Sequence, residues 1–151
     1  MLFELLSKFL IFGLIYLLIE CIFTGITSII HKRDIHGTCH TYLSMIPIGG
    51  TTALTLDLIR TSLDSPTIWI GIDWQFLWLA PIYLIVIYMA EFISGWLYEK
   101  VTGRCPWKYG KGRWTIMGFV NLEYFRFWLF LALCFNPISV GLHKFYLFLV
   151  G

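Results

Sequence analysis

Four ionisable residues stand inside apolar stretches of this chain. Glu20, Glu91 and Glu123 each lie among aliphatic and aromatic residues, and Arg126 follows Glu123 by three positions. Charged groups within membrane-spanning segments are costly and usually mark a site that binds a proton, an ion or a polar group. We therefore take these four residues as the candidate intramembrane polar site.

The three carboxylates are expected at similar depths. At a rise of about 1.5 Å per residue from the nearest basic loop, each glutamate lies roughly 10 to 18 Å into its helix. Arg126 stays protonated and can bind two carboxylates through its planar guanidinium group. One positive charge cannot neutralise three acids, so at least one glutamate is expected to be protonated or to bind a cation. Alternatively, these groups fix helix register or reach towards the interface.

A loop between the second and third of these acids carries a compact motif, Cys105-Pro106-Trp107 followed by Tyr109. Proline restricts the backbone and tryptophan favours the membrane interface, so we expect the motif to position the loop against helix ends.

Metal and thiol chemistry are only weakly indicated. His36, Cys39, His40 and Cys105 match no structural zinc spacing, and sequence alone does not bring Cys105 to a histidine. We therefore predict no metal, no cofactor and no catalytic residue.

The composition is that of a membrane protein. Of 151 residues, 58% are hydrophobic and only 13% are charged. The net charge of +2 is small and the basic residues are concentrated in loops, so nucleic-acid binding is not expected. Little chain remains outside the apolar runs, and residues 1–151 are predicted to form a single integral membrane domain.

The apolar runs predict an all-α, polytopic membrane helical bundle with about four transmembrane helices and a C-terminal half-helix. Pro47, Gly49 and Gly50 interrupt the second run, which forms either a kinked span or a re-entrant segment. Asn136-Pro137 is expected to end the fourth helix. The predicted helices cover residues 3–30, 41–60, 74–101 and 116–135, with the half-helix over 138–150.

The basic residues predict the orientation of these spans. Loops 31–40 and 102–115 are basic, whereas the loop between them carries Asp64 and Asp73. Cytoplasmic loops are enriched in lysine and arginine, so both basic loops are predicted to be cytoplasmic and the termini to lie outside.

The order of several short motifs resembles the type IV ABC-transporter permease family, and is similar also to the related vertebrate four-helix transmembrane proteins. The motifs are Glu20-Cys21-Ile22-Phe23-Thr24, the stretch GTCHTYLSMIPIGG ending at Gly50, Glu91-Phe92-x-Ser94-Gly95-Trp96, Cys105-Pro106-Trp107-x-Tyr109 and Gly118-Phe119-x-x-Leu122-Glu123-Tyr124. The resemblance covers roughly residues 13 to 136. Lys108 and Arg126 depart from it, since the family usually carries aspartate at the first position and an apolar residue or proline at the second.

The resemblance implies a permease-like transport component of a larger assembly. No Walker A motif is found, so any ATP hydrolysis requires a separate subunit. The expected partners are membrane lipids and either further copies of the chain or other membrane subunits. Two alternatives stay open: a structural or accessory subunit of a membrane complex, and, with less support, a membrane-embedded enzyme acting on lipid headgroups. Enzymatic activity is therefore not the favoured interpretation.

Overall fold

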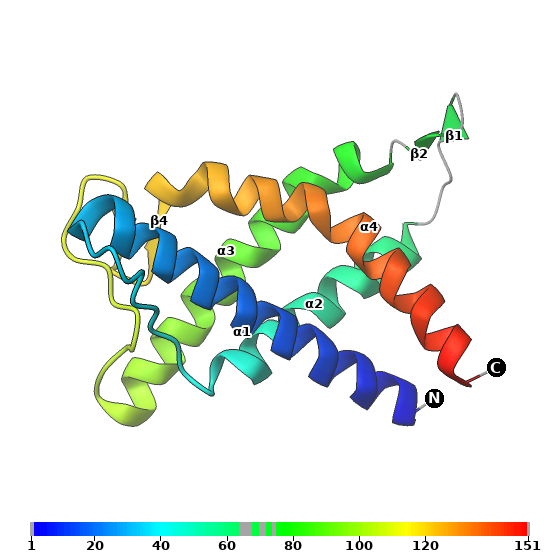
Figure 1. Ribbon diagram of the computed structural model, residues 1–151, viewed down its shortest axis with the longest axis horizontal. Helices are drawn as coiled ribbons and strands as arrows, with labels where there is room; N and C mark the ends of the chain where they lie inside the picture. Colours follow the sequence, from blue (N-terminus) through cyan, green and yellow to red (C-terminus); the bar gives the residue numbers. More distant parts are fainter. Residues whose placement is uncertain (1, 64–67, 70–71, 74, 151) are drawn as a thin grey trace. The chain divides into compact units, whose positions relative to one another are not determined.

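The computed structural model describes residues 2–63, 68–69, 72–73 and 75–150, and these are almost entirely helical (Figure 1). The prediction of an all-α bundle is confirmed. The helices are α1 (Leu2–Lys32), α2 (Met45–Ser62), α3 (Gln75–Thr102) and α4 (Phe125–Val150), with a 3-10 helix η1 (Leu122–Tyr124). Two antiparallel hairpins join them, β1 (Ile68–Trp69) with β2 (Ile72–Asp73), and β3 (Thr115–Ile116) with β4 (Val120–Asn121).

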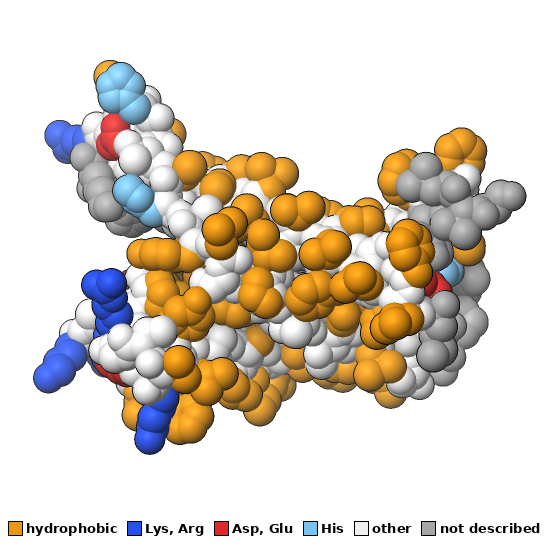
Figure 2. All heavy atoms as spheres, turned by 90° about the horizontal axis from the view of Figure 1, so that it is seen from below, with side chains coloured by type: hydrophobic (Ala, Val, Ile, Leu, Met, Phe, Trp, Pro, Cys, Tyr) orange, Lys and Arg blue, Asp and Glu red, His pale blue; other side chains and the backbone are white. Residues whose placement is uncertain are grey.

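Within these described residues, three helical segments are long and apolar enough to cross a membrane. They are Leu2–Ile30, Leu77–Thr102 and Leu122–Phe145, with mean hydropathies of 2.3, 1.8 and 1.5. Their large aliphatic side chains point outwards, as at Leu18 and Ile85, and apolar side chains cover much of the surface seen in Figure 2. Three of the roughly four expected spans therefore meet this requirement, whereas α2 is less apolar and does not.

Pro47 lies at the start of α2, which runs as one helix from Met45 to Ser62, whereas the sequence predicted an interruption within residues 41–60. The helix begins at Met45, so Pro47 lies in its first turn, where backbone N–H groups have no partner within the helix. The turn before it is closed by hydrogen bonds from Met45 N to Tyr42 O and from Ile46 N to Leu43 O. Proline is therefore compatible with this first turn of the helix.

The chain divides into two compact units, residues 1–55 and 56–151. In the first unit, α1 meets the beginning of α2 at Gly13. A side-chain carbon added at this glycine would lie 2.5 Å from the backbone oxygen of Ile46. Glycine therefore permits a close backbone approach that any other residue would prevent, which is a common device at helix contacts in membranes.

The core of the second unit lies between α3, α4 and the end of α2. Its buried members are Leu56, Leu79, Ala80, Tyr83 and Ala132. The ring of Tyr83 packs edge-on against Phe135 at 5.3 Å between centroids. Figure 1 shows α3 and α4 running in opposite directions across one another.

The C-terminal region differs from the prediction of a helix ending near 135 and a separate half-helix. α4 runs without interruption through Pro137 to Val150. Proline is tolerated within membrane helices where neighbouring helices cover the backbone groups that it frees, and the adjacent Asn136 and Ser139 are buried.

The predicted start of the fourth helix at residue 116 is also wrong. Residues 115–121 form a hairpin, in which Met117 (φ 51°) and Gly118 (φ 79°) occupy a turn closed by Phe119 N and Ile116 O at 3.0 Å. Two successive positive φ angles are the pattern of a type I′ turn, and they are incompatible with a right-handed helix. The side chain of Asn121 then accepts a hydrogen bond from Glu123 N at 3.0 Å and caps η1.

Candidate functional site

Glu91 is a buried acid within a candidate membrane span. It lies on α3, and only 9% of its surface is exposed. The hydroxyl group of Tyr109 donates a hydrogen bond of 2.8 Å to Oε1 of Glu91. The loop after α3 therefore supplies a polar partner for a carboxylate on that helix.

The hairpin β3–β4 holds Tyr109 in place. The backbone N–H of Tyr109 donates to the carbonyl oxygen of Gly118 at 2.8 Å, and the Tyr109 ring lies 5.7 Å from that of Tyr124. The aromatic ring of Phe119 in the same hairpin packs against Phe92 of α3 at 5.6 Å. The hairpin thus links the end of α3 to the beginning of α4 around Glu91.

The Cys-Pro-Trp motif, which precedes Tyr109 in the chain, lies against α3. Cys105 is buried, and its burial raises the pKa of the thiol. The ring of Trp107 lies 6.0 Å from that of Tyr98 on α3, and Lys108 forms an ion pair with Glu99. A buried thiol with a raised pKa is a poor nucleophile, so the position of Cys105 favours a packing role.

The four residues of the candidate polar site lie in different surroundings. Glu123 and Arg126 are exposed, and no ion pair between them occurs in the part of the chain that the structure describes. Glu20 is half-buried on α1 in the first unit. Its grouping with Glu91, Glu123 and Arg126 stays a prediction.

A second buried polar cluster was not anticipated from the sequence. Asp57 on α2 forms an ion pair with Arg60 at 3.1 Å, with 12% and 16% of the two side chains exposed. Ser139 on α4 donates a hydrogen bond of 2.5 Å to Oδ1 of Asp57. Close by in the same core, Tyr83 donates to Oδ1 of Asn136 at 3.3 Å. Polar side chains therefore join α2 to α4 through Asp57 and Ser139, and α3 to α4 through Tyr83 and Asn136.

The pairing of Asp57 with Arg60 could have been predicted from the sequence. Asp57 and Arg60 are three residues apart in an otherwise uncharged helix, a spacing that pairs side chains on one face. Their partner Ser139 lies beyond Pro137, where the helix was expected to break. That expectation placed Ser139 in a separate half-helix over 138–150, whereas the continuous α4 brings it to Asp57.

The basic loop after α1 is folded upon itself around Asp34. Its carboxylate accepts hydrogen bonds from the backbone N–H groups of His36 and Thr38, at 3.0 and 3.1 Å. The interactions with Thr38, side chain and backbone, lower the pKa of Asp34 most, because they stabilise its charged form. The loop then returns to α1, where His40 N donates to Thr24 Oγ1 at 3.2 Å.

A comparison with protein families identifies the group to which these features belong. The family described as Putative ABC-transporter type IV matches residues 7–148, which is nearly the whole chain. The chain belongs to this family. Family membership and the three apolar helices together make it an integral membrane protein related to ABC transporters. No solved structure matches the chain.

The residues matched by the family include both buried polar clusters of the second unit. Glu91 with Tyr109 and Asp57 with Ser139 all lie between residues 7 and 148. The resemblance expected from the motif order is thereby confirmed at the level of the family.

Proposed function

We propose that this protein is a multi-pass, permease-like transport component in which Glu91 binds the transported proton or monovalent cation. The observation that carries the proposal is the burial of Glu91 within a candidate span, with its carboxylate bonded to Tyr109. Buried acids in membrane helices commonly line ion pathways and proton relays. Membership of a transporter-related family supports the same role.

Tyr109 is the positioning residue in this proposal. Its hydroxyl group can donate to the charged carboxylate, and it can rotate when a cation takes the carboxylate oxygen. Because Tyr109 belongs to the loop and Glu91 to α3, cation binding would be coupled to the position of the loop. Glu20, on α1, is proposed as a second acid of the pathway.

The proposal also includes an orientation in the membrane, taken from the basic loops, and a partner subunit. Loops 31–40 and 102–115 are proposed to lie in the cytoplasm. Glu91 would then lie in the half of α3 that is nearer to the cytoplasm. Since the chain has no Walker A motif, a separate ATPase subunit would supply energy if transport is active.

A structural role in a larger membrane complex is the second candidate. The Asp57–Arg60–Ser139 group favours it, because buried and hydrogen-bonded polar groups often fix the register of helices. In that case the outward aliphatic faces of the helices would meet other subunits.

Flux measurements on reconstituted protein test the first candidate. The protein and any co-purifying subunits are placed in liposomes that contain a dye sensitive to pH, to sodium or to potassium, and the flux of each cation is driven by a membrane potential. We expect Glu91→Gln to abolish the flux. Tyr109→Phe should tighten the binding of the proton or cation about ten- to a hundredfold, because it removes the hydrogen bond that stabilises the empty, charged carboxylate.

The matched control is Glu99→Gln, two turns later on α3, where the carboxylate pairs with Lys108 on the loop instead. This variant should retain the flux. Unchanged flux in Glu91→Gln, together with lowered thermal stability, would instead support the structural role. Absence of any flux from the wild-type preparation would also contradict the transport proposal.

A further inference from the structure

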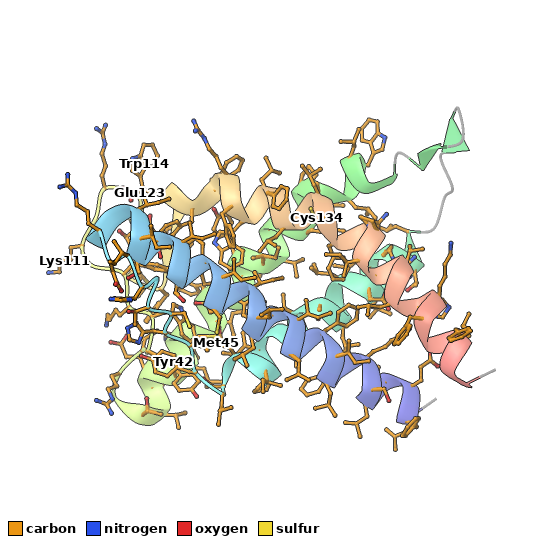
Figure 3. The ribbon with its side chains drawn as sticks, in the orientation of Figure 1. Tyr42, Met45, Lys111, Trp114, Glu123 and Cys134 are labelled. Carbon is orange, nitrogen blue, oxygen red and sulfur yellow. The ribbon has the colours of Figure 1, made fainter. Side chains whose placement is uncertain are left out.

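The residue before β3, the 3-10 helix η1 and the beginning of α4 form a groove on the outer surface of the second unit. The groove has a volume of about 350 Å³ and is lined by Trp114, Leu122, Glu123 and Phe125. Figure 3 shows Trp114 and Glu123 next to one another at this end of α4. Three of the four lining side chains are apolar and one is a carboxylate.

The groove lies where a lipid headgroup would meet the protein. Leu122 is the first residue of the candidate span Leu122–Phe145, so we expect the groove at the boundary between hydrocarbon and water. Trp114, Met117 and Phe125 are exposed there, and tryptophan is enriched at this depth of a membrane.

Charges of both signs surround the groove. Glu123 lies within it, Arg126 follows one helical turn later, and the guanidinium carbon of Arg113 lies 6.0 Å from the centroid of the Trp114 ring. In the part of the chain that the structure describes, neither Glu123 nor Arg126 forms an ion pair. One acid beside two arginines complements a ligand that carries an ammonium group and a phosphate group.

We infer that the groove binds the headgroup of phosphatidylethanolamine, with the ammonium group at Glu123 and the phosphate at Arg113 and Arg126. Arginine binds phosphate through paired hydrogen bonds, and a carboxylate accepts hydrogen bonds from a primary ammonium. The acyl chains would lie along the apolar outer face of α4. This role explains the two exposed charged residues at the start of a membrane helix.

Native mass spectrometry of the delipidated protein tests the inference. The protein is titrated with phosphatidylethanolamine, phosphatidylcholine and phosphatidylglycerol of identical acyl chains. We expect phosphatidylethanolamine to bind about tenfold more tightly than the other two, because only it offers both a hydrogen-bonding ammonium and a phosphate. Glu123→Gln should remove this preference, and Arg126→Gln should weaken the binding of all three lipids, because each of them carries the phosphate.

Two control variants show whether the lipid preference arises at this groove. Glu4→Gln removes a carboxylate from α1 and should leave the lipid preference unchanged. Glu91→Gln should also leave it unchanged, so that the lipid site can stand even where the cation proposal fails. Equal binding of the three lipids, a preference for phosphatidylglycerol, or a preference that survives Glu123→Gln would each overturn the inference.

Discussion

Asp57 shows how a single side chain can depend on partners from another helix. It is bonded to Arg60 on its own helix and to Ser139 on α4, and it is largely shielded from solvent. A buried ion pair gains little over apolar packing, but the removal of one partner leaves an uncompensated charge. The cost of substitution should therefore depend on which partner is lost.

We predict that Asp57→Ala lowers the free energy of unfolding by about 3 to 5 kcal/mol, because it leaves Arg60 buried without its partner. Ser139→Ala removes only the hydrogen bond to the carboxylate and should cost about 1.5 to 3 kcal/mol. Unfolding of purified protein in mixed micelles, followed by circular dichroism, measures both values.

Glu4→Ala is the matched control for this pair of variants. Glu4 pairs with Lys8 on α1 at 3.2 Å, but 35% of its side chain is exposed. Exposed pairs contribute less than about 1 kcal/mol. If Asp57→Ala cost no more than Glu4→Ala, the network around Asp57 would have no structural role.

At the scale of elements, the hairpin β3–β4 is the part that determines the geometry of the Glu91 site. Gly118 accepts a hydrogen bond from Tyr109 N, and Tyr109 in turn donates to Glu91. A side-chain carbon at Gly118 would lie 3.0 Å from the carbonyl oxygen of Tyr109. The turn, the loop and the acid on α3 are therefore mechanically connected.

We predict that Gly118→Ala displaces the Tyr109 segment and exposes Cys105. Its φ of 79° costs alanine about 1 to 2 kcal/mol, and the contact with Tyr109 adds to this strain. In a variant whose other three cysteines are replaced by alanine, Cys105 should be alkylated at least about tenfold faster, the change expected for a further 1.4 kcal/mol of local opening.

Gly103→Ala separates backbone strain from the contact. Gly103 also has a φ of 79°, but an added side-chain carbon there would meet no atom within 4 Å. This variant should lose stability through strain alone while Cys105 stays protected. Equal alkylation rates in both variants would show that Gly118 does not position the loop.

At the scale of the whole molecule, the distribution of charge predicts how the chain is oriented in the membrane. The exposed Lys111 belongs to the basic loop 102–115, and the exposed Leu63 belongs to the connection between α2 and α3. Because basic residues are enriched in cytoplasmic loops, these two positions are expected on opposite sides of the bilayer.

We predict that a single cysteine at Lys111→Cys, in a cysteine-free background, reacts with a membrane-impermeant maleimide only from the cytoplasmic side. Leu63→Cys should react only from the outside. Labelling of intact cells and of inverted vesicles measures the two accessibilities. Labelling of both positions from the same side would contradict the proposed topology, and labelling of Lys111→Cys from outside would reverse it.

Much of the architecture follows from the sequence alone. The apolar runs predicted α1 nearly to its ends and placed α3 within a few residues, because a lipid-exposed span must be continuously apolar and must satisfy its own backbone hydrogen bonds. The order of the motifs likewise indicated the family, which the family comparison confirmed. Glu91 was recognisable because an acid in such a run is rare.

The tertiary structure decided what local patterns left open. Pro137 signals a break in isolation, but α4 continues through it. The apolar residues after Ile116 suggested a helix, yet positive φ angles at Met117 and Gly118 produce a hairpin. The pairs Glu91–Tyr109 and Asp57–Ser139 join residues 18 and 82 positions apart. Contacts between such distant positions depend on how helices pack, which composition and periodicity do not specify.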